Sequence, residues 1–204
     1  MNSLDQLNAI LDYVQDPEHD LSTGAPDWQF VFAVILSSQT TDIQVNKITP
    51  ALFARFSTLQ SFADAVQSDV EEMLNTIPFF RNKAKALIGT AKKINDHNGV
   101  IPNNLNDLVQ LPGVGRKVAN VILTNIHSQA AVVVDTHVKR VAHRLGWSKA
   151  KTADGVEKDL TKLIPNHQQV QASNALVLFG RYTCKAKRPL CPMCPITNCS
   201  SRSI

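Results

Sequence analysis

The sequence predicts an all-α protein, and three observations support this prediction. Apolar residues recur at three- and four-residue steps along most of the 204-residue chain. Only residues 130–134 have the composition of a β-strand, and no second strand-like segment alternates with them. Proline and glycine divide the periodic segments into helices with short connections, which is typical of a packed helical fold.

The first helices can be placed from stripes and end signals. The first stripe consists of Leu4, Leu7, Ile10, Leu11 and Val14. Residues 22–27 form a loop, and Pro26 or Asp27 opens a buried helix over residues 28–36. Ser68 and Glu71 fit a capping box ahead of a helix that Pro78 ends. An amphipathic helix over residues 83–95 turns four residues inward: Ala84, Leu87, Ile88 and Ala91.

The second half of the chain continues in the same way. Gly99, in the loop at residues 97–102, suits a helix C-cap. Thr152 is a helix N-cap. We expect the remaining helices at residues 105–109, 118–126, 138–145, 152–164 and 168–179.

Composition excludes some classes of protein. The apolar fraction of 44% is that of an ordinary globular chain, and the net charge of +4 is a mild basic bias. No apolar run approaches the roughly 20 residues of a membrane span. Residues 1–20 carry acids and no basic region, so they do not resemble a signal peptide. We therefore expect a cytoplasmic, nucleoid-associated protein of bacterial type, with no membrane partner.

The segment Leu111-Pro-Gly-Val-Gly-Arg-Lys117 is the most informative part of the chain. Pro112 and Gly113 form a tight turn, and Gly115 lets the backbone approach a bulky group. The amides of residues 114–116 then open a helix as free donors, and such an end binds anions, including DNA phosphate. The segment is typical of a helix–hairpin–helix. The alternative is a plain joint between helices, with the glycines needed for packing.

Lys117 lies in the first turn of the helix that follows the hairpin. The buried face of that helix consists of Val118, Val121, Ile122 and Ile126. Lys117, Asn120 and Thr124 share another face, so Lys117 points outward or into a cleft. It is either a solvated phosphate contact or a nucleophilic amine, and its position alone leaves both interpretations open.

Asp135 follows the apolar run 132–134 and precedes a helical stripe. An aspartate at this place is a good N-cap, and a capping role is compatible with catalysis because it fixes the carboxylate. His137 is a candidate second polar group of the same site, and a packed histidine is its alternative.

All the cysteines lie within residues 184–199, at Cys184, Cys191, Cys194 and Cys199. A disulfide framework spreads its cysteines over the fold, so this grouping favours a metal or a 4Fe–4S cluster. Zinc is the alternative, but its commonest signature has two Cys-x2-Cys pairs, whereas one is present here. Lys185, Lys187 and Arg188 between the first two cysteines form either a phosphate-binding loop or a solvated tail.

These motifs, in this order, resemble the bacterial endonuclease III family. The resemblance covers about residues 28–199 and includes Val-Asp-Thr-His at 134–137 and Gly-Arg-Tyr-Thr-Cys at 180–184. It implies a two-lobed helix–hairpin–helix glycosylase fold with a DNA cleft. One domain would be a helical bundle over residues 21–130, and the other would combine residues 1–20 and 131–204 and carry the 4Fe–4S loop. The last cysteine gap is four residues here and five in the family.

The same resemblance implies an activity. The family consists of bifunctional DNA glycosylases and abasic-site lyases, here a monomer acting on damaged double-stranded DNA. The amine of Lys117 would attack C1′ of a flipped nucleotide and displace an oxidised or ring-saturated pyrimidine. A Schiff base would then lead to β-elimination 3′ to the abasic site. Asp135 would activate the lysine or stabilise the charge that develops at the sugar.

Two further segments resemble DNA-contacting segments of the family. In residues 36–42, Gln39 matches the glutamine that enters the space left by the flipped base. In residues 77–84, Phe79 best matches an apolar wedge, although Pro78 stands where glycine is usual. Ordinary core packing is the alternative for Phe79 and Phe80. The implied DNA contacts are Gln39, Phe79, Gly113, Val114, Gly115, Arg116, Lys185 and Arg188.

Other functions share part of this pattern. Adenine glycosylases of similar sequence carry a glutamate about where Ile35 stands and lack the catalytic lysine. A thymine-mismatch glycosylase is disfavoured by Lys117 in the same way. A non-catalytic module that uses the hairpin as a clamp is the alternative from another class.

Overall fold

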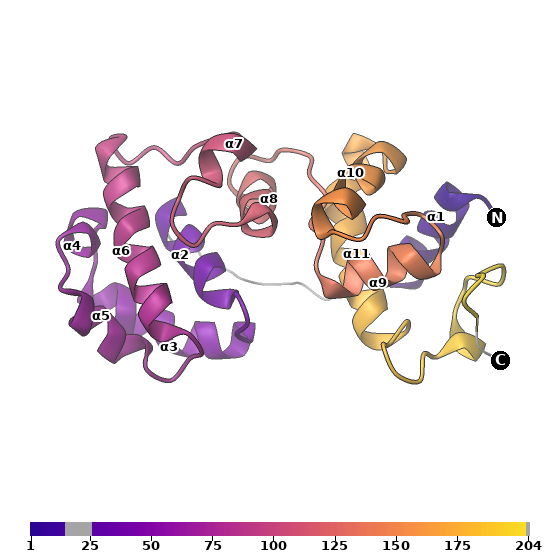
Figure 1. Cartoon of the computed structure of the whole chain (residues 1–204), viewed down its shortest axis with the longest axis horizontal. Helices are drawn as coiled ribbons and strands as arrows, with labels where there is room; N and C mark the ends of the chain where they lie inside the picture. The colour runs from indigo at the N-terminus through magenta and orange to yellow at the C-terminus, as the bar shows by residue number, and fades with distance from the viewer. Residues whose placement is uncertain (15–25, 203–204) are drawn as a thin grey trace. The chain divides into compact units, whose positions relative to one another are not determined.

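The computed structural model describes residues 1–14 and 26–202, and all regular structure in them is helical (Figure 1). The α-helices are α1 (Ser3–Tyr13), α2 (Asp27–Ser37), α3 (Asp42–Arg55), α4 (Leu59–Ala63), α5 (Gln67–Leu74), α6 (Phe80–Asp96), α7 (Leu105–Leu108), α8 (Arg116–Asn125), α9 (Thr136–Arg144), α10 (Ala153–Leu163) and α11 (Gln169–Tyr182). Two 3₁₀ turns occur as well, η1 (Asn166–Gln168) and η2 (Cys191–Met193). The predicted all-α fold is confirmed. None of the described helices is both long and apolar enough to cross a bilayer.

The chain divides into two compact units, each with its own hydrophobic core. Unit 1 comprises Met1–His19 and Ser128–Ile204, and unit 2 comprises Asp20–His127. The chain therefore leaves unit 1 after its first segment, completes unit 2, and then returns.

In unit 2, helix α2 is the central element. Its residues 30–36 are all buried, so it has neighbours around its whole circumference, as its continuous apolar sequence predicts. Phe32 and Phe62 pack edge to face with their ring centroids 4.9 Å apart. Helix α6 presents its buried face to the same core and continues to Asp96. The helix ends in this loop as predicted, but Asn98, with φ +57°, takes the left-handed position after the C-cap His97, and Gly99 follows it and donates its N–H to the carbonyl of Ile94.

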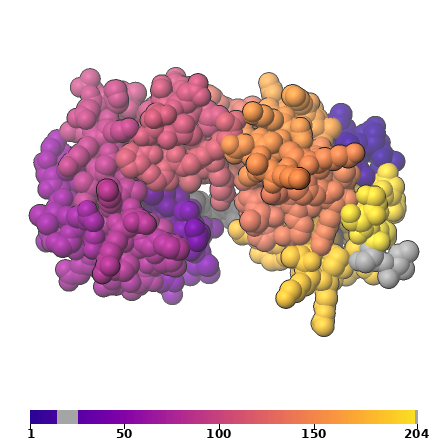
Figure 2. Space-filling view, in the orientation of Figure 1, coloured from indigo at the N-terminus to yellow at the C-terminus, as the bar shows by residue number. Residues whose placement is uncertain are grey.

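In unit 1, helix α1 packs beside α11 and is tied to the last part of the chain (Figure 1). The indole Nε1 of Trp147 donates to Gln6 Oε1 at 2.7 Å, and Gln6 Nε2 donates to Asn198 Oδ1 at 3.1 Å. Asn198 Nδ2 in turn donates to the carbonyl of Met1 at 2.8 Å. The indigo and yellow segments accordingly meet on the surface of unit 1 (Figure 2).

Several element boundaries differ from the predicted ones. Helix α5 begins at Gln67 after an N-cap, Val66, that makes no side-chain cap, so the capping box predicted for Ser68 and Glu71 is wrong. Ser68 lies one residue inside the helix, and Glu71 instead accepts from Gln67 Nε2 at 2.6 Å. Helix α6 begins three residues earlier and ends one residue later than predicted, and α11 begins one residue later and ends three residues later. Of the loop predicted at residues 22–27, residues 22–25 lie outside the described residues.

The strand-like stretch at residues 130–134 forms neither a helix nor a strand, and the described residues contain no sheet, as expected. The N–H of Val133 donates to Ser173 Oγ of α11 at 3.1 Å instead. This bond and the buried side chains of Val132 and Val134 deliver Asp135 to a defined place on unit 1.

Candidate nucleic-acid interface and active site

The predicted hairpin is a hydrogen-bonded turn at residues 111–114. The N–H of Val114 donates to the carbonyl of Leu111 at 3.0 Å, and Gly113 has φ +79°. Proline followed by a left-handed glycine is what a type II turn requires. The amide of Val114 is therefore used inside the turn, and the expectation that it is a free donor is wrong.

Helix α6 holds this hairpin through two side-chain bonds. Thr90 Oγ1 donates to the carbonyl of Pro112 at 2.8 Å, and Lys93 Nζ donates to the carbonyl of Gln110 at 2.6 Å. The packing is also close, because a Cβ on Gly113 would lie 2.8 Å from the Cβ of Ala86. Gly113 is therefore needed both for the backbone angle of the turn and for close packing against α6, so both interpretations of the glycine apply.

Helix α8 begins at Arg116 with Gly115 as an N-cap that makes no side-chain cap. The N–H of Gly115 has no hydrogen-bond partner among the described residues, and a Cβ there would meet open space. Uncapped amides at a helix start attract anions. Lys117 is exposed in the first turn of this helix. Asn120 is 3% exposed, so it does not share the outward face with Lys117 as predicted.

Asp135 is the N-cap of α9, as predicted. Its Oδ1 accepts from the N–H of His137 at 2.7 Å and from that of Val138 at 2.9 Å. Its Oδ2 has no hydrogen bond to any described residue, so this oxygen stays available for chemistry. His137 is half-buried and packs against Gly180, where a Cβ would lie 2.9 Å from its own Cβ. This is the packed alternative considered for His137.

One open hollow on unit 2 brings three of the sequence-predicted DNA contacts together. The hollow has a volume of about 470 Å³, and its lining includes Gln39, Phe79 and Gly113. The other residues that line the hollow are Ile35, Ser38, Asn82, Lys83 and Ala86. These residues come from α2, from the turn after it, from α6 and from the hairpin.

Gln39 and Phe79 both adopt left-handed backbone conformations, with φ +55° and +58°. Such angles are uncommon for residues with a Cβ, and they concentrate at functional sites. Phe79 is 59% exposed and is the N-cap of α6, so the core alternative does not hold for it. Phe80 is half-buried and packs against the core of unit 2, so that alternative describes Phe80 well.

Lys83 is a site residue that sequence reasoning missed. Its side chain is 6% exposed in the wall of the hollow, and its Nζ donates to Thr40 Oγ1 at 2.5 Å. Burial lowers the pKa of Lys83 below its ordinary value. Helical spacing held a signal for this position, because residues 83, 87, 90 and 94 follow one face of α6, and all four are buried.

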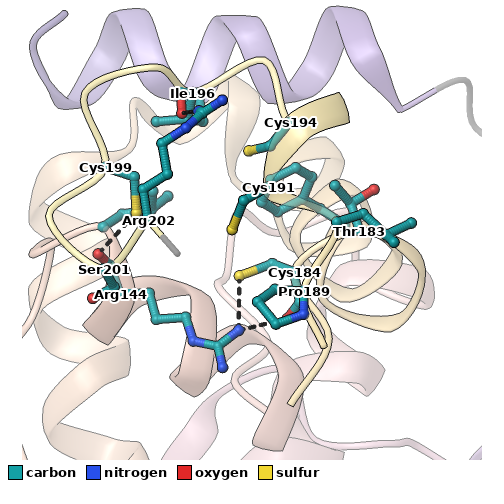
Figure 3. A pocket seen from close by; sticks show the side chains of 13 residues that line it. Arg144, Thr183, Cys184, Pro189, Cys191, Cys194, Ile196, Cys199, Ser201 and Arg202 are labelled. Carbon is teal, nitrogen blue, oxygen red and sulfur yellow. Dashed lines mark hydrogen bonds between the residues drawn. The ribbon is translucent and has the colours of Figure 1, made fainter. Parts of the chain in front are cut away.

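The four cysteines line one pocket of unit 1, of about 380 Å³. Figure 3 shows Cys184, Cys191 and Cys194 turned toward the same space. Cys199 Sγ lies 3.4 Å from the carbonyl of Arg144 and donates to it. No three Cys, His, Asp or Glu side chains in the described ranges converge closely enough to hold a single ion.

The pocket disfavours the thiolate form of Cys194. Burial is the main reason that the pKa of the Cys194 thiol is raised, and the negative charge of Cys184, Cys191 and Cys199 raises it further. A hydrogen bond from the backbone of Ile196 acts in the opposite direction. A cationic centre in this pocket would reverse the balance and keep the sulfurs deprotonated.

Arg144 organises the loop between the first two cysteines. Its guanidinium donates to Cys184 Sγ at 3.3 Å (Figure 3). It also donates to the Lys185 carbonyl at 2.7 Å and to the Ala186 carbonyl at 3.2 Å. Because these bonds hold the backbone, the side chains of Lys185 and Arg188 remain exposed. Arg188 also adopts a left-handed conformation, with φ +51°.

Comparison with known proteins adds three findings. Residues 32–166 match the HhH-GPD superfamily base excision DNA repair protein family. Endonuclease III of Synechocystis sp. is 42% identical over 83% of this chain and 78% of its own length, and that of Bacillus subtilis is 37% identical over 96% and 92%. A solved structure of a trapped endonuclease III–DNA covalent intermediate, an estranged-adenine complex, superposes with a TM-score of 0.89 at 34% identity over 97% of this chain and 94% of that one.

Proposed function

The chain belongs to the endonuclease III family within the HhH-GPD superfamily of base-excision repair proteins, and on that premise we propose that Lys117 and Asp135 carry out its DNA glycosylase and lyase reaction. The observation that carries this proposal is the position of Lys117. Its exposed primary amine follows directly on the uncapped, phosphate-binding start of α8. A nucleophile beside a phosphate-binding helix end is suited to reach the sugar of the bound strand.

The reaction uses the lone pair of the Lys117 amine. The nitrogen bonds to C1′ of the flipped nucleotide while the glycosidic bond breaks. The electron pair of the glycosidic bond leaves with the base, which gains a proton. Opening of the sugar ring gives a Schiff base between Nζ and C1′. Loss of a C2′ proton then expels the 3′ phosphate, which breaks the strand by β-elimination.

Asp135 contributes a fixed negative charge. Two backbone amides hold its Oδ1, so the carboxylate is oriented by α9 itself, and Oδ2 is left to act. A preorganised anion stabilises the positive charge that develops at the sugar, and as a general base its free oxygen would accept the proton that the lysine amine loses. The substrates proposed on family grounds are oxidised or ring-saturated pyrimidines and abasic sites in duplex DNA.

The remaining contacts hold the strand and fill the stack. We assign backbone binding to the hairpin residues Gly113–Arg116, in which the amide of Val114 closes the turn. Lys185 and Arg188 offer exposed positive charge to phosphates. Gln39 and Phe79, in the wall of one hollow, fill the space that the flipped nucleotide leaves.

The four cysteines fit a 4Fe–4S cluster. A zinc ion needs its thiolates about 2.3 Å from a single point, and the absence of such convergence among the described residues disfavours it. A cubane takes one thiolate on each iron, which suits cysteines spread around one pocket. The cluster would supply positive charge that stabilises the thiolates and the loop bearing Lys185 and Arg188. Loss of one residue from the last cysteine gap leaves all four sulfurs in the lining.

Single-lesion duplexes test the proposed function. With thymine glycol or an abasic site in one strand, the protein is expected to release the base and to leave the 3′ end of β-elimination. A protein that binds these duplexes and cleaves none of them is a clamp without catalysis. Excision of adenine opposite oxidised guanine, without strand cleavage, would support the adenine glycosylase alternative.

Replacing Phe79 with Ala is expected to weaken binding to abasic-site DNA about tenfold, since stacking of a base on an aromatic side chain contributes roughly 1–3 kcal/mol. The thermal midpoint should change little, because the side chain is 59% exposed. Fluorescence anisotropy with a labelled duplex measures the affinity. Phe80→Ala is the matched control and should show the reverse pattern, a lower midpoint with a smaller change in affinity.

The purified protein is expected to be brown and to hold about four iron and four sulfide per chain. Arg144→Met should retain the cluster on purification and lose it faster in the presence of chelator, because the bond to Cys184 Sγ and the loop carbonyls is removed. Absorbance and metal analysis follow both quantities. A colourless protein that holds one zinc ion would overturn the assignment of the cofactor.

A further inference from the structure

The turn that carries Gln39 is strained. The N–H of Thr40 donates to the carbonyl of Ser37 at 3.1 Å, with Ser38 at φ −60°, ψ 116° and Gln39 at φ +55°. These are the angles of a type II turn, whose third position is normally glycine or asparagine. Glutamine persists in such a conformation only when its surroundings determine it.

Lys83 is the long-range contact that holds this turn. Its Nζ donates to Thr40 Oγ1 at 2.5 Å, across 43 positions of sequence. Thr40 Oγ1 otherwise makes one bond among the described residues, a local one in which it donates to the Ser38 carbonyl at 3.4 Å. The last residue of the turn is therefore fixed to α6 by the lysine.

A lysine at this position lowers the stability of the fold. It is 6% exposed, burial lowers its pKa, and no carboxylate pairs with it among the described residues. A methionine would fill the same volume without the desolvation of a charge. A buried group that weakens the fold is characteristic of a position kept for function.

We propose that Lys83 is a positioning residue that holds the turn at residues 37–40, so that Gln39 already has, in the free protein, the conformation in which it enters the gap in the base stack. Lys83 then contributes to DNA binding through Gln39 rather than by a contact of its own. This inference rests on the proposed function, since it gives Gln39 the gap-filling role. Without the bond to Thr40, the turn is free to adopt other conformations. DNA binding must then order the turn, and the conformational entropy lost in doing so weakens the affinity.

A double-mutant cycle tests the coupling. Anisotropy gives the dissociation constant of a duplex with a stable abasic analogue for the wild type, Lys83→Met, Gln39→Ala and the double variant. Each single change is expected to weaken binding about tenfold, and the double variant is expected to bind no more weakly than Gln39→Ala alone. Thr40→Val should reproduce Lys83→Met, and Thr40→Ser, which keeps the acceptor, should bind as the wild type does.

Two controls separate this role from others. Lys85 is exposed on the same helix, and Lys85→Met should leave the affinity unchanged. Lys185 lies in the other unit. When Lys83→Met is combined with Lys185→Ala, it should therefore weaken DNA binding by the same factor as it does in the wild type. The thermal midpoint of Lys83→Met should equal or exceed that of the wild type, because a buried charge is removed.

The inference would be overturned if the losses of affinity in the two single variants added up in the double variant. It would also be overturned if Lys83→Met lowered the thermal midpoint and further weakened DNA binding by the Gln39→Ala variant. Borohydride trapping by the wild-type protein is scored in parallel. If the wild type forms no adduct with abasic DNA, the proposed function fails. If it forms the adduct and the cycle is additive, only the role of Lys83 fails.

Discussion

Lys117→Ala is expected to abolish the covalent adduct that borohydride traps between the protein and abasic-site DNA. Strand cleavage should fall by about 10⁴-fold or more, because removal of a nucleophile leaves only the catalysis provided by binding. The fold should be unaffected, since the side chain is exposed in the first turn of α8. Denaturing electrophoresis measures adduct and cleavage on the same samples.

Binding is the internal control for this variant. The hairpin contacts phosphate through main-chain amides, so Lys117→Gln should bind abasic DNA with an affinity within a few-fold of the wild type. Lys85→Ala removes an exposed lysine of unit 2 and should trap normally. An unchanged adduct in Lys117→Ala would assign the nucleophile to another amine.

Asp135→Asn is expected to lower the rate of base release by about 10³-fold while leaving the fold intact, because it removes a preorganised charge and keeps a capping oxygen. The wild-type carboxylate receives the N–H groups of His137 and Val138 on Oδ1, and an asparagine carbonyl accepts the same bonds. Single-turnover release of the base and the thermal midpoint are the two measurements.

Asp135→Ala separates the two roles of this residue. It loses the cap as well as the charge, so the free energy of unfolding should fall by about 1 kcal/mol, in addition to the loss of activity. That corresponds to roughly 2–4 °C in the thermal midpoint of a chain of this size. If Asp135→Asn keeps the activity of the wild type, Asp135 is a cap and nothing more.

Local chemistry made much of this site predictable. Thr152 and Asp135 begin helices where the sequence predicts, since each role depends on one side chain and the adjoining backbone. The hairpin is of the same kind: Pro112 fixes the backbone angle that the second turn position needs, and Gly113 tolerates the positive φ of the third. The positions of the hairpin and of the cap of α9 therefore follow from short segments.

Features that depend on distant contacts were missed. The burial of Lys83 requires Thr40, and the burial of Asn120 requires neighbours beyond the stripe of α8. Ser68 has the right residue three positions later for a capping box, yet the chain turns into α5 one residue earlier. Where a helix begins was decided here by its packing, which a local motif does not contain.

Backbone strain marks the proposed interface better than composition does. The left-handed residues other than glycine in the described ranges are Gln39, Phe79, Asn98, Ser128 and Arg188. Three of these five, Gln39, Phe79 and Arg188, are positions to which the resemblance gives DNA contacts. Asn98 belongs to the C-cap of α6, where a left-handed residue is ordinary.

The bond network that joins Met1, Gln6 and Asn198 bears on biosynthesis. Helix α1 is translated before unit 2, but the other members of the core cluster that buries Leu7 and Ile10, from Val132 to Ile196, are translated after unit 2. Domains tend to fold as they emerge, so unit 2 can reach its native state while the apolar face of α1 is still waiting for a partner. A nascent chain of this topology would thus need to protect the apolar face of one short helix until the second segment of unit 1 has been synthesised.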